Sequence, residues 1–125
     1  GHSVTLFEAS DEIGGQFQMA RRIPGKEEFS ETLRYYRRQL ELTGVQVRLG
    51  VRVGANELSS GFDVVVLATG VTPRRIQLEG LDHSKVLSYV DVILHGAEVG
   101  EKVAIIGAGG IGFDVAEFLT HSETK

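Results

Sequence analysis

Short apolar runs along the chain predict a set of strands. Strands are expected at 3–8, 45–50 and 62–70, with a further short one at 52–54. The run at 62–70 is the strongest, because four consecutive apolar residues suit a strand that is buried on both faces. A last strand at 102–107 leads into a glycine-rich turn.

Helical spacing fills much of the rest. In the segment 26–43, apolar residues recur at steps of three and four, namely Phe29, Leu33, Tyr36 and Leu40. This spacing predicts an amphipathic helix that ends at Gly44. Shorter helices are expected at 88–96 and 110–121, and the loop at 11–26 is expected to hold one helical turn. The alternation of strands and helices predicts an α/β fold.

Composition narrows the class of protein only a little. The chain has 125 residues, a formal net charge of −4 and no cysteine. The acidic balance argues against a nucleic-acid surface, and no apolar run reaches membrane-spanning length. Without cysteine there is no disulfide, thiolate metal site or catalytic thiol, and a cytoplasmic location is expected.

The turn GAGGIG at 107–112 carries the clearest chemistry. It matches G-x-G-x-x-G through Gly107, Gly109 and Gly112, and it lies between an expected strand and an expected helix. Such a turn brings the backbone close to a pyrophosphate at the start of the helix, where Gly110 and Ile111 also lie. The alternative is a glycine-rich turn without a ligand. The residue that would distinguish NADH from NADPH is expected after Lys125, so that choice stays open.

A second nucleotide signal stands near the other end of the chain. Glu8 closes the first strand, as does the acid that binds ribose hydroxyls in dinucleotide folds, and Gly14, Gly15 and Gln16 follow it. The two glycines let backbone amides face phosphate oxygens. A solvated carboxylate followed by a plain turn is the alternative. The glycine-rich turn that would accompany Glu8 is expected before Gly1.

A third element, LATG at 67–70, follows the strongest strand. Ala68 and Gly70 are small enough for a ligand to approach the backbone, and Thr69 can form a hydrogen bond to it. Alone, this pattern is only a strand end. The four histidines show no metal-binding spacing, and the sequence predicts neither a catalytic residue nor a metal ligand.

Taken together, these motifs resemble a known family. The stretches VTLFEAS, IGGQF, IPGKEEF, VVVLATG and VAIIGAGGIGFDVAEFL are similar to the C-terminal region of NADPH-dependent 2,4-dienoyl-CoA reductases, within the NADH:flavin oxidoreductase group. The resemblance covers essentially the whole chain. It implies a Rossmann-like FAD/NAD(P)-binding fold with a mostly parallel sheet, truncated at both ends. Residues 1–70 would be part of the FAD domain, 71–100 a connecting segment and 101–125 the first βα unit of the NAD(P)H domain.

The resemblance also implies a larger parent protein, with an FMN-binding barrel and an iron–sulfur cluster. Electrons would pass from NADPH through FAD, the cluster and FMN to an unsaturated acyl-CoA. Glu8 would then bind the FAD ribose, Gly14 to Gln16 its pyrophosphate side and the backbone at Val53 its adenine. Residues 68–70 would close the FAD site, and 107–112 would hold the NAD(P)H pyrophosphate. The rival functions are the electron-input part of an amine dehydrogenase or another enoate reductase, and a non-catalytic binding domain of flavoprotein descent.

Because a first βα unit would be missing, the chain alone is expected to bind FAD weakly and to be inactive. We hypothesise that strand 102–107 and helix 110–121 take the place of that unit, either within the chain or from a second copy in a domain-swapped dimer.

Overall fold

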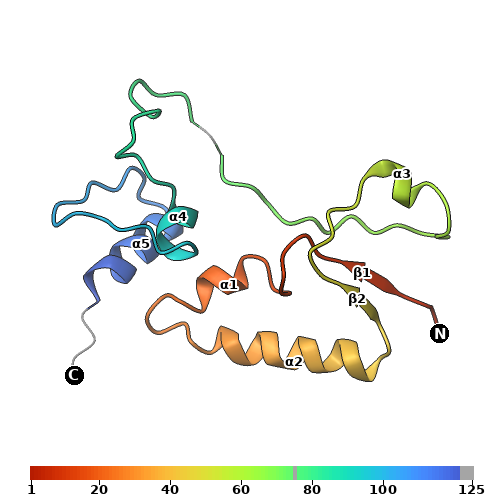
Figure 1. Ribbon diagram of the computed structural model, residues 1–125. Coiled ribbons are helices and arrows are strands. Elements are labelled where there is room, and N and C mark those ends of the chain that lie inside the picture. The colour runs from red at the N-terminus through yellow and green to blue at the C-terminus, as the bar shows by residue number, and fades with distance from the viewer. Residues whose placement is uncertain (75, 122–125) are drawn as a thin grey trace. The chain divides into compact units, whose positions relative to one another are not determined.

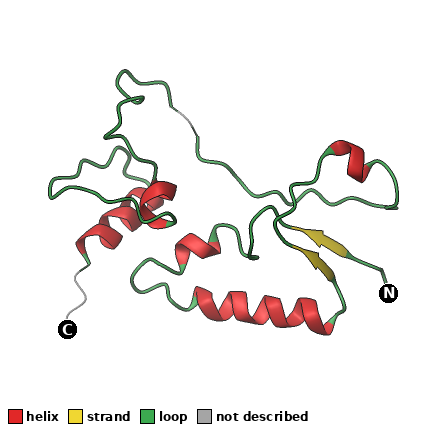
Figure 2. Ribbon diagram, in the orientation of Figure 1, coloured by secondary structure: helices red, strands yellow, loops and turns green. Residues whose placement is uncertain are grey.

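The structure is a computed structural model, and it describes residues 1–74 and 76–121. Within these residues, seven helices and strands follow one another (Figures 1 and 2). They are β1 (Thr5–Phe7), α1 (Phe17–Ala20), α2 (Phe29–Leu42), β2 (Gln46–Arg48), α3 (Ala55–Leu58), α4 (Tyr89–Ile93) and α5 (Gly110–Thr120).

Contacts divide the chain into two compact units. Unit 1 comprises Gly1–Gly15 and Ser30–Val71, and unit 2 comprises Gln16–Phe29 and Thr72–Lys125. This division rests on contacts and not on cofactors. The expected cofactor domains at 1–70 and 101–125, with their connecting segment, therefore stay predictions.

Unit 1 is built on a pair of parallel strands. β1 and β2 pair in register, with Thr5 opposite Gln46 and Phe7 opposite Arg48. Parallel strands require a crossover, and α2 provides it as a β-α-β connection. Of the four side chains that the helical pattern assigned to the apolar face, Leu33 is buried and Phe29 and Leu40 are half-buried, whereas Tyr36 is 56% exposed. Both strands and this helix are therefore confirmed, each a few residues shorter than expected.

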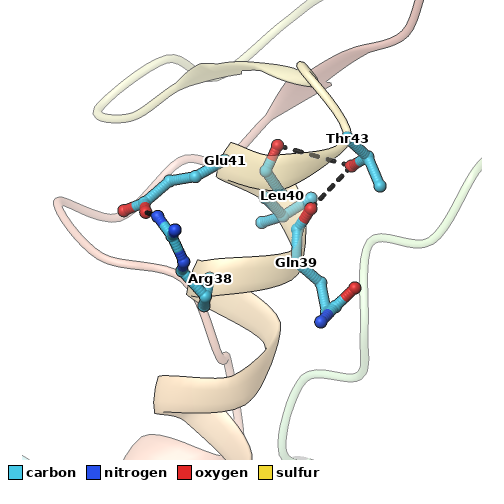
Figure 3. Close-up of polar contacts among 5 residues, drawn as sticks. All are labelled: Arg38, Gln39, Leu40, Glu41 and Thr43. Carbon is cyan, nitrogen blue, oxygen red and sulfur yellow. Dashed lines mark hydrogen bonds and ion pairs between the residues drawn. The ribbon is translucent and has the colours of Figure 1, made fainter.

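Gly44 ends α2 as expected. Its φ of 69° lies in the left-handed region, its N–H donates to the Glu41 carbonyl at 3.1 Å, and the Val45 N–H donates to the Leu40 carbonyl at 3.0 Å. This pair of bonds is the Schellman arrangement. In the same turn the Thr43 hydroxyl donates to the Gln39 carbonyl at 2.7 Å (Figure 3).

Three expected strands are wrong for the described residues. The segments 52–54, 62–70 and 102–107 are not strands, and helix α3 begins directly after the first of them. In the strongest of the three, Val64, Val66 and Leu67 are 77%, 82% and 78% exposed. A strand needs the backbone of a neighbour to satisfy its hydrogen bonds, and no described residues pair with this run. The expected mostly parallel sheet is thus one two-stranded parallel pair.

Unit 2 has a small apolar core made from three segments. Ile23, Ile93 of α4 and Val115 of α5 are buried together, and partly buried side chains pack against them, namely Met19, Tyr89, Phe118 and Leu119. Helices α1, α4 and α5 confirm the helical turn and the two short helices that the sequence predicts. No helix in the described ranges has the length and apolarity needed to cross a membrane.

The structure contradicts the hypothesis that residues 102–107 and 110–121 replace the missing first βα unit within the same chain. Residues 102–107 form no strand, β1 pairs with β2, and α5 contacts α4 in unit 2. The physical reason is that the apolar side of α5, through Val115, is already used in the core with Ile23 and Ile93. The domain-swapped form, which needs a second copy of the chain, stays a prediction.

Candidate functional site

The glycine-rich turn before α5 has the backbone that a phosphate-binding turn requires. Gly107 has a φ of 118°, which only glycine adopts readily, and Gly109 is the extended N-cap of α5. The first bond into the helix runs from the Phe113 N–H to the Gly109 carbonyl at 3.2 Å. The N–H groups of the three preceding residues therefore have no acceptor in the helix, and they stand at its positive end.

The third glycine of the motif is fixed by packing. A Cβ at Gly112 would lie 2.2 Å from the carbonyl oxygen of Gly107, closer than any real side chain allows. At Gly109 and Gly110, by contrast, a Cβ would meet nothing within 4 Å. The turn thus packs tightly on the inner side at Gly112 and is open at Gly109 and Gly110. This arrangement fits a dinucleotide pyrophosphate.

Glu8 lies where β1 ends, beside the segment that carries Val53. The Val51 N–H donates to the Glu8 carbonyl at 2.9 Å, and the Gly50 N–H donates to the Ser10 carbonyl at 2.8 Å. The Glu8 carboxylate accepts a hydrogen bond from the Ser10 N–H at 2.8 Å through Oε1. Glu8 is thus bonded to Val51, two residues before Val53, where the two parallel strands end, and such sheets bind ligands at this edge.

Gly14 and Gly15 form a turn that other residues would adopt only with strain. Their φ values are 121° and 50°, and no atom lies within 4 Å of a Cβ at Gly15. Gln16 follows as the N-cap residue of α1. The requirement for glycine at both positions is conformational, and at Gly15 it does not come from crowding within the chain.

The predicted residues at 68–70 are placed differently. Ala68, Thr69 and Gly70 are exposed and lie outside any strand, and Gly70 has a φ of 72°. They take no part in the backbone hydrogen bonds that join Glu8 and Ser10 to Gly50 and Val51. The structure therefore bonds Glu8 to the segment just before Val53, and the described residues show no backbone hydrogen bond from Glu8 to 68–70.

A cavity of about 140 Å³ in unit 2 joins residues from the two predicted cofactor sites. Gln16, predicted to face FAD, and Ile111, predicted to face NAD(P)H, both line it. Ile23 and Ile93 form part of its apolar wall, and Tyr89 and Asp114 also border it. Sequence reasoning assigned no role to Tyr89 or Asp114.

Two cations fix the loop after α1 to the neighbouring helices. Lys26 Nζ donates to Asp114 Oδ1 of α5 at 2.6 Å. Arg22 Nη1 donates to the carbonyls of Ile93 and Leu94, at the end of α4, at 2.9 and 2.6 Å. The sequence offered one signal for Lys26, its place in the IPGKEEF stretch, but nothing that paired it with Asp114.

Two carboxylates have lowered pKa values for structural reasons. The Ser88 hydroxyl and backbone N–H hold the pKa of Asp91 below its ordinary value. Backbone N–H groups of Glu27 and Gly25 do the same for the pKa of Glu27. Both carboxylates remain ionised at neutral pH, so neither is tuned for proton transfer.

Comparison with known proteins agrees with this geometry. Residues 1–125 match the family described as pyridine nucleotide-disulphide oxidoreductase. The chain belongs to this family. Membership in the pyridine nucleotide-disulphide oxidoreductases implies that FAD and NAD(P)H are the ligands of this region.

Several relatives of this pyridine nucleotide-disulphide oxidoreductase chain are reductases or dehydrogenases. Cinnamate reductase from Clostridium sporogenes is 37% identical over 125 residues, covering 95% of this chain and 18% of that protein. N,N-dimethylglycine/sarcosine dehydrogenase from Chromohalobacter salexigens is 37% identical over 112 residues, covering 84% of this chain and 16% of that protein. A solved structure of 2-naphthoyl-CoA reductase with 2-naphthoyl-CoA matches with a TM-score of 0.90 and 34% identity, covering 95% of this chain and 18% of that one. The chain thus spans less than a fifth of the length of each of these relatives.

Proposed function

We propose that this chain is the nucleotide-binding part of a flavin-dependent NAD(P)H oxidoreductase that reduces an unsaturated acyl-CoA, as 2,4-dienoyl-CoA reductases do. The carrying observation is the contact between Gly112 and Gly107, because it builds a turn that fits a dinucleotide pyrophosphate. The names of two relatives support an unsaturated acyl compound as the electron acceptor: one is a cinnamate reductase, and the other is a 2-naphthoyl-CoA reductase.

Most of the predicted residues then have a specific role in binding the two nucleotides. When bound, NAD(P)H supplies a hydride and FAD accepts it. The free N–H groups at the start of α5 bind the NAD(P)H pyrophosphate, Gly109 leaves room for it and Gly112 keeps the turn against the helix. Glu8 accepts hydrogen bonds from the FAD ribose, and the backbone near Val53 contacts adenine. The flexible backbone of Gly14 and Gly15 directs amides to the FAD phosphates.

The remaining redox groups of the proposed parent belong outside this chain. A chain without cysteine has no thiolate for an iron–sulfur cluster, so the cluster and the FMN barrel would be supplied by other parts of the protein. The chain alone therefore orients the nucleotides and is not expected to reduce the acyl-CoA. The proposed setting is the cytoplasm.

A second candidate has support of its own. The similarity to N,N-dimethylglycine/sarcosine dehydrogenase favours an amine dehydrogenase that uses the same nucleotide-binding region. The two candidates differ in the direction of electron flow: a reductase withdraws electrons from NAD(P)H, whereas an amine dehydrogenase oxidises its substrate and delivers them to an acceptor.

The deciding experiment uses the full-length natural protein that carries this chain. Its bound flavins are released and identified by chromatography, and its visible spectrum is followed under anaerobic conditions with NADPH or NADH, then with a dienoyl-CoA. Bleaching by a nicotinamide nucleotide and recovery on adding the acyl-CoA support the proposal. Bleaching by sarcosine instead selects the amine dehydrogenase. A protein that binds neither FAD nor NAD(P)H is a non-catalytic relative, and the proposal is then wrong.

A further inference from the structure

Lys26 and Asp114 form an ion pair just after the first turn of α5, the helix whose start is proposed to bind NAD(P)H. Asp114 lies four residues after Gly110, roughly 6 Å along the axis from the first residue of α5. Its Oδ1 lies 2.6 Å from Lys26 Nζ, and the two side chains are only 30% and 38% exposed. The partners come from segments 88 residues apart, so the fold and not local sequence brings them together.

A carboxylate in this place creates an electrostatic conflict. The first turn of α5 contains no acidic residue, and Asp114, which follows that turn, gains little from the positive end of the helix. A partly buried carboxylate without a counter-charge would also repel the two phosphate charges, because solvent screens it less than a fully exposed one. Lys26 brings the counter-charge, and its bond to Asp114 offsets this repulsion.

The loop that carries Lys26 is held firmly enough for this task. Ile23, three residues before it, is 2% exposed in the core of unit 2. Arg22 binds two carbonyls at the end of α4, and the Lys26 N–H donates to the Ile23 carbonyl at 3.0 Å. The ammonium therefore reaches α5 from a loop fixed at two nearby points.

We propose that Lys26 is a positioning residue for the NAD(P)H site, and that it maintains dinucleotide affinity by neutralising Asp114. Lys26 acts through Asp114, so its importance depends on that carboxylate being present. This inference rests on the proposed function, since it requires the glycine turn at 107–112 to hold a pyrophosphate.

The test is a charge cycle in the full-length natural protein, read by the dissociation constants of NADPH and NADH. Lys26→Met, which leaves Asp114 without its partner, is expected to weaken binding of the preferred nucleotide by about threefold to tenfold at low salt. Asp114→Asn is expected to bind as tightly as the wild type or more tightly. The double variant is expected to stay within about twofold of the wild type, and Lys26→Arg, which keeps the charge, should do the same.

Two further measurements separate electrostatics from folding. The loss in Lys26→Met is expected to shrink as salt is raised, whereas a purely structural loss would not. Arg38→Met on α2 removes an equal charge from the exposed Arg38–Glu41 pair and is the control for net charge. If Lys26→Met does not fold, Asp114→Asn and Lys26→Gln carry the same test.

The outcomes distinguish the inference from the proposed function. Equal losses in Lys26→Met and Asp114→Asn would show that the pair only supports the fold, and would overturn the inference. So would unchanged affinity in Lys26→Met, or a loss that salt does not alter. In those cases the wild type still binds the nucleotide and the proposed function stands. A wild-type protein that binds neither nucleotide removes the proposed function and, with it, the inference.

Discussion

A methyl group on the Cα of Gly112 would lie 2.2 Å from the carbonyl oxygen of Gly107 and 3.1 Å from its carbonyl carbon. Both atoms belong to the backbone, so they cannot rotate away as the end of a side chain could. The contact holds the glycine turn against the first turn of α5 and leaves Gly109 open. One pair of glycines therefore shapes both the helix start and the proposed pyrophosphate site.

Gly112→Ala is expected to disturb both the start of α5 and the proposed pyrophosphate site. We expect the free energy of unfolding to fall by about 1–3 kcal/mol, because the turn must move to admit the methyl group. NAD(P)H affinity is expected to fall at least about tenfold, since the amides at the helix start lose their alignment. Urea unfolding and nucleotide titration measure the two effects. The control for stability is Gly110→Ala, where a Cβ meets nothing and a helical alanine should be neutral or stabilising. Equal stability losses in both variants would contradict the packing argument.

Gly44→Ala tests the end of α2. Gly44 has a φ of 69° and nothing within 4 Å of its missing Cβ, so the cost comes from backbone conformation alone. We expect a loss of about 1–2 kcal/mol in the free energy of unfolding, measured by chemical denaturation. Gly100→Ala is the matched control, because Gly100 is equally uncrowded and lies outside the left-handed region. A loss of the same size at Gly100 would show that the left-handed turn is not its cause.

Every described helix except α3, which the sequence did not predict, could be predicted because its signals are local. The spacing of Phe29 and Leu33, the stop at Gly44 and the turn after Gly109 all lie within a few residues of the structure that they determine. Strand formation is different, since it depends on a neighbour. The run at 62–70 has the composition of a buried strand, yet its apolar side chains are exposed because no described segment pairs with it.

In the candidate site, too, the residues with local signals could be predicted and those brought together by long-range packing could not. Gly107, Gly109 and Gly112 could be found from a motif six residues long, and the structure gives them a turn that fits it. The ion pair of Lys26 with Asp114 could not, because it joins positions 88 residues apart. Neither residue belongs to a recognised nucleotide motif, and only the packing of the loop around Ile23 on α5 brings them together.

Ser88→Ala is expected to raise the pKa of Asp91. The Ser88 hydroxyl donates to Asp91 Oδ2 at 2.6 Å and is the largest cause of the lowered pKa of that carboxyl, whose ordinary value is 3.8. A lowered pKa in the folded state means that ionised Asp91 stabilises the fold above about pH 4, and that this contribution is lost as pH falls through the lowered value. The variant should therefore lose less stability on acidification than the wild type.

Carboxyl NMR titration of Asp91 checks this prediction directly. The pKa in Ser88→Ala should move up toward its ordinary value but not fully reach it, because the Ser88 backbone N–H still donates to the carboxylate at 2.9 Å. Ser59→Ala removes a hydroxyl that bonds the Asn56 carbonyl and should leave Asp91 unchanged. An unchanged Asp91 pKa in Ser88→Ala would rule out the hydroxyl as its cause.

Ile23→Ala tests whether the core of unit 2 rests on this one side chain. Ile23 is 2% exposed and contacts a cluster drawn from α4 and α5, so its truncation leaves a cavity and is expected to cost about 2–4 kcal/mol. The same change at Ile106, which is 69% exposed, should cost less than about 0.5 kcal/mol in the 125-residue chain. Chemical denaturation of both variants measures the difference. Because the loop around Ile23 also carries Arg22 and Lys26, we further expect Ile23→Ala to speed hydrogen exchange in α5. Similar losses at the two isoleucines would mean that Ile23 is not the centre of this core.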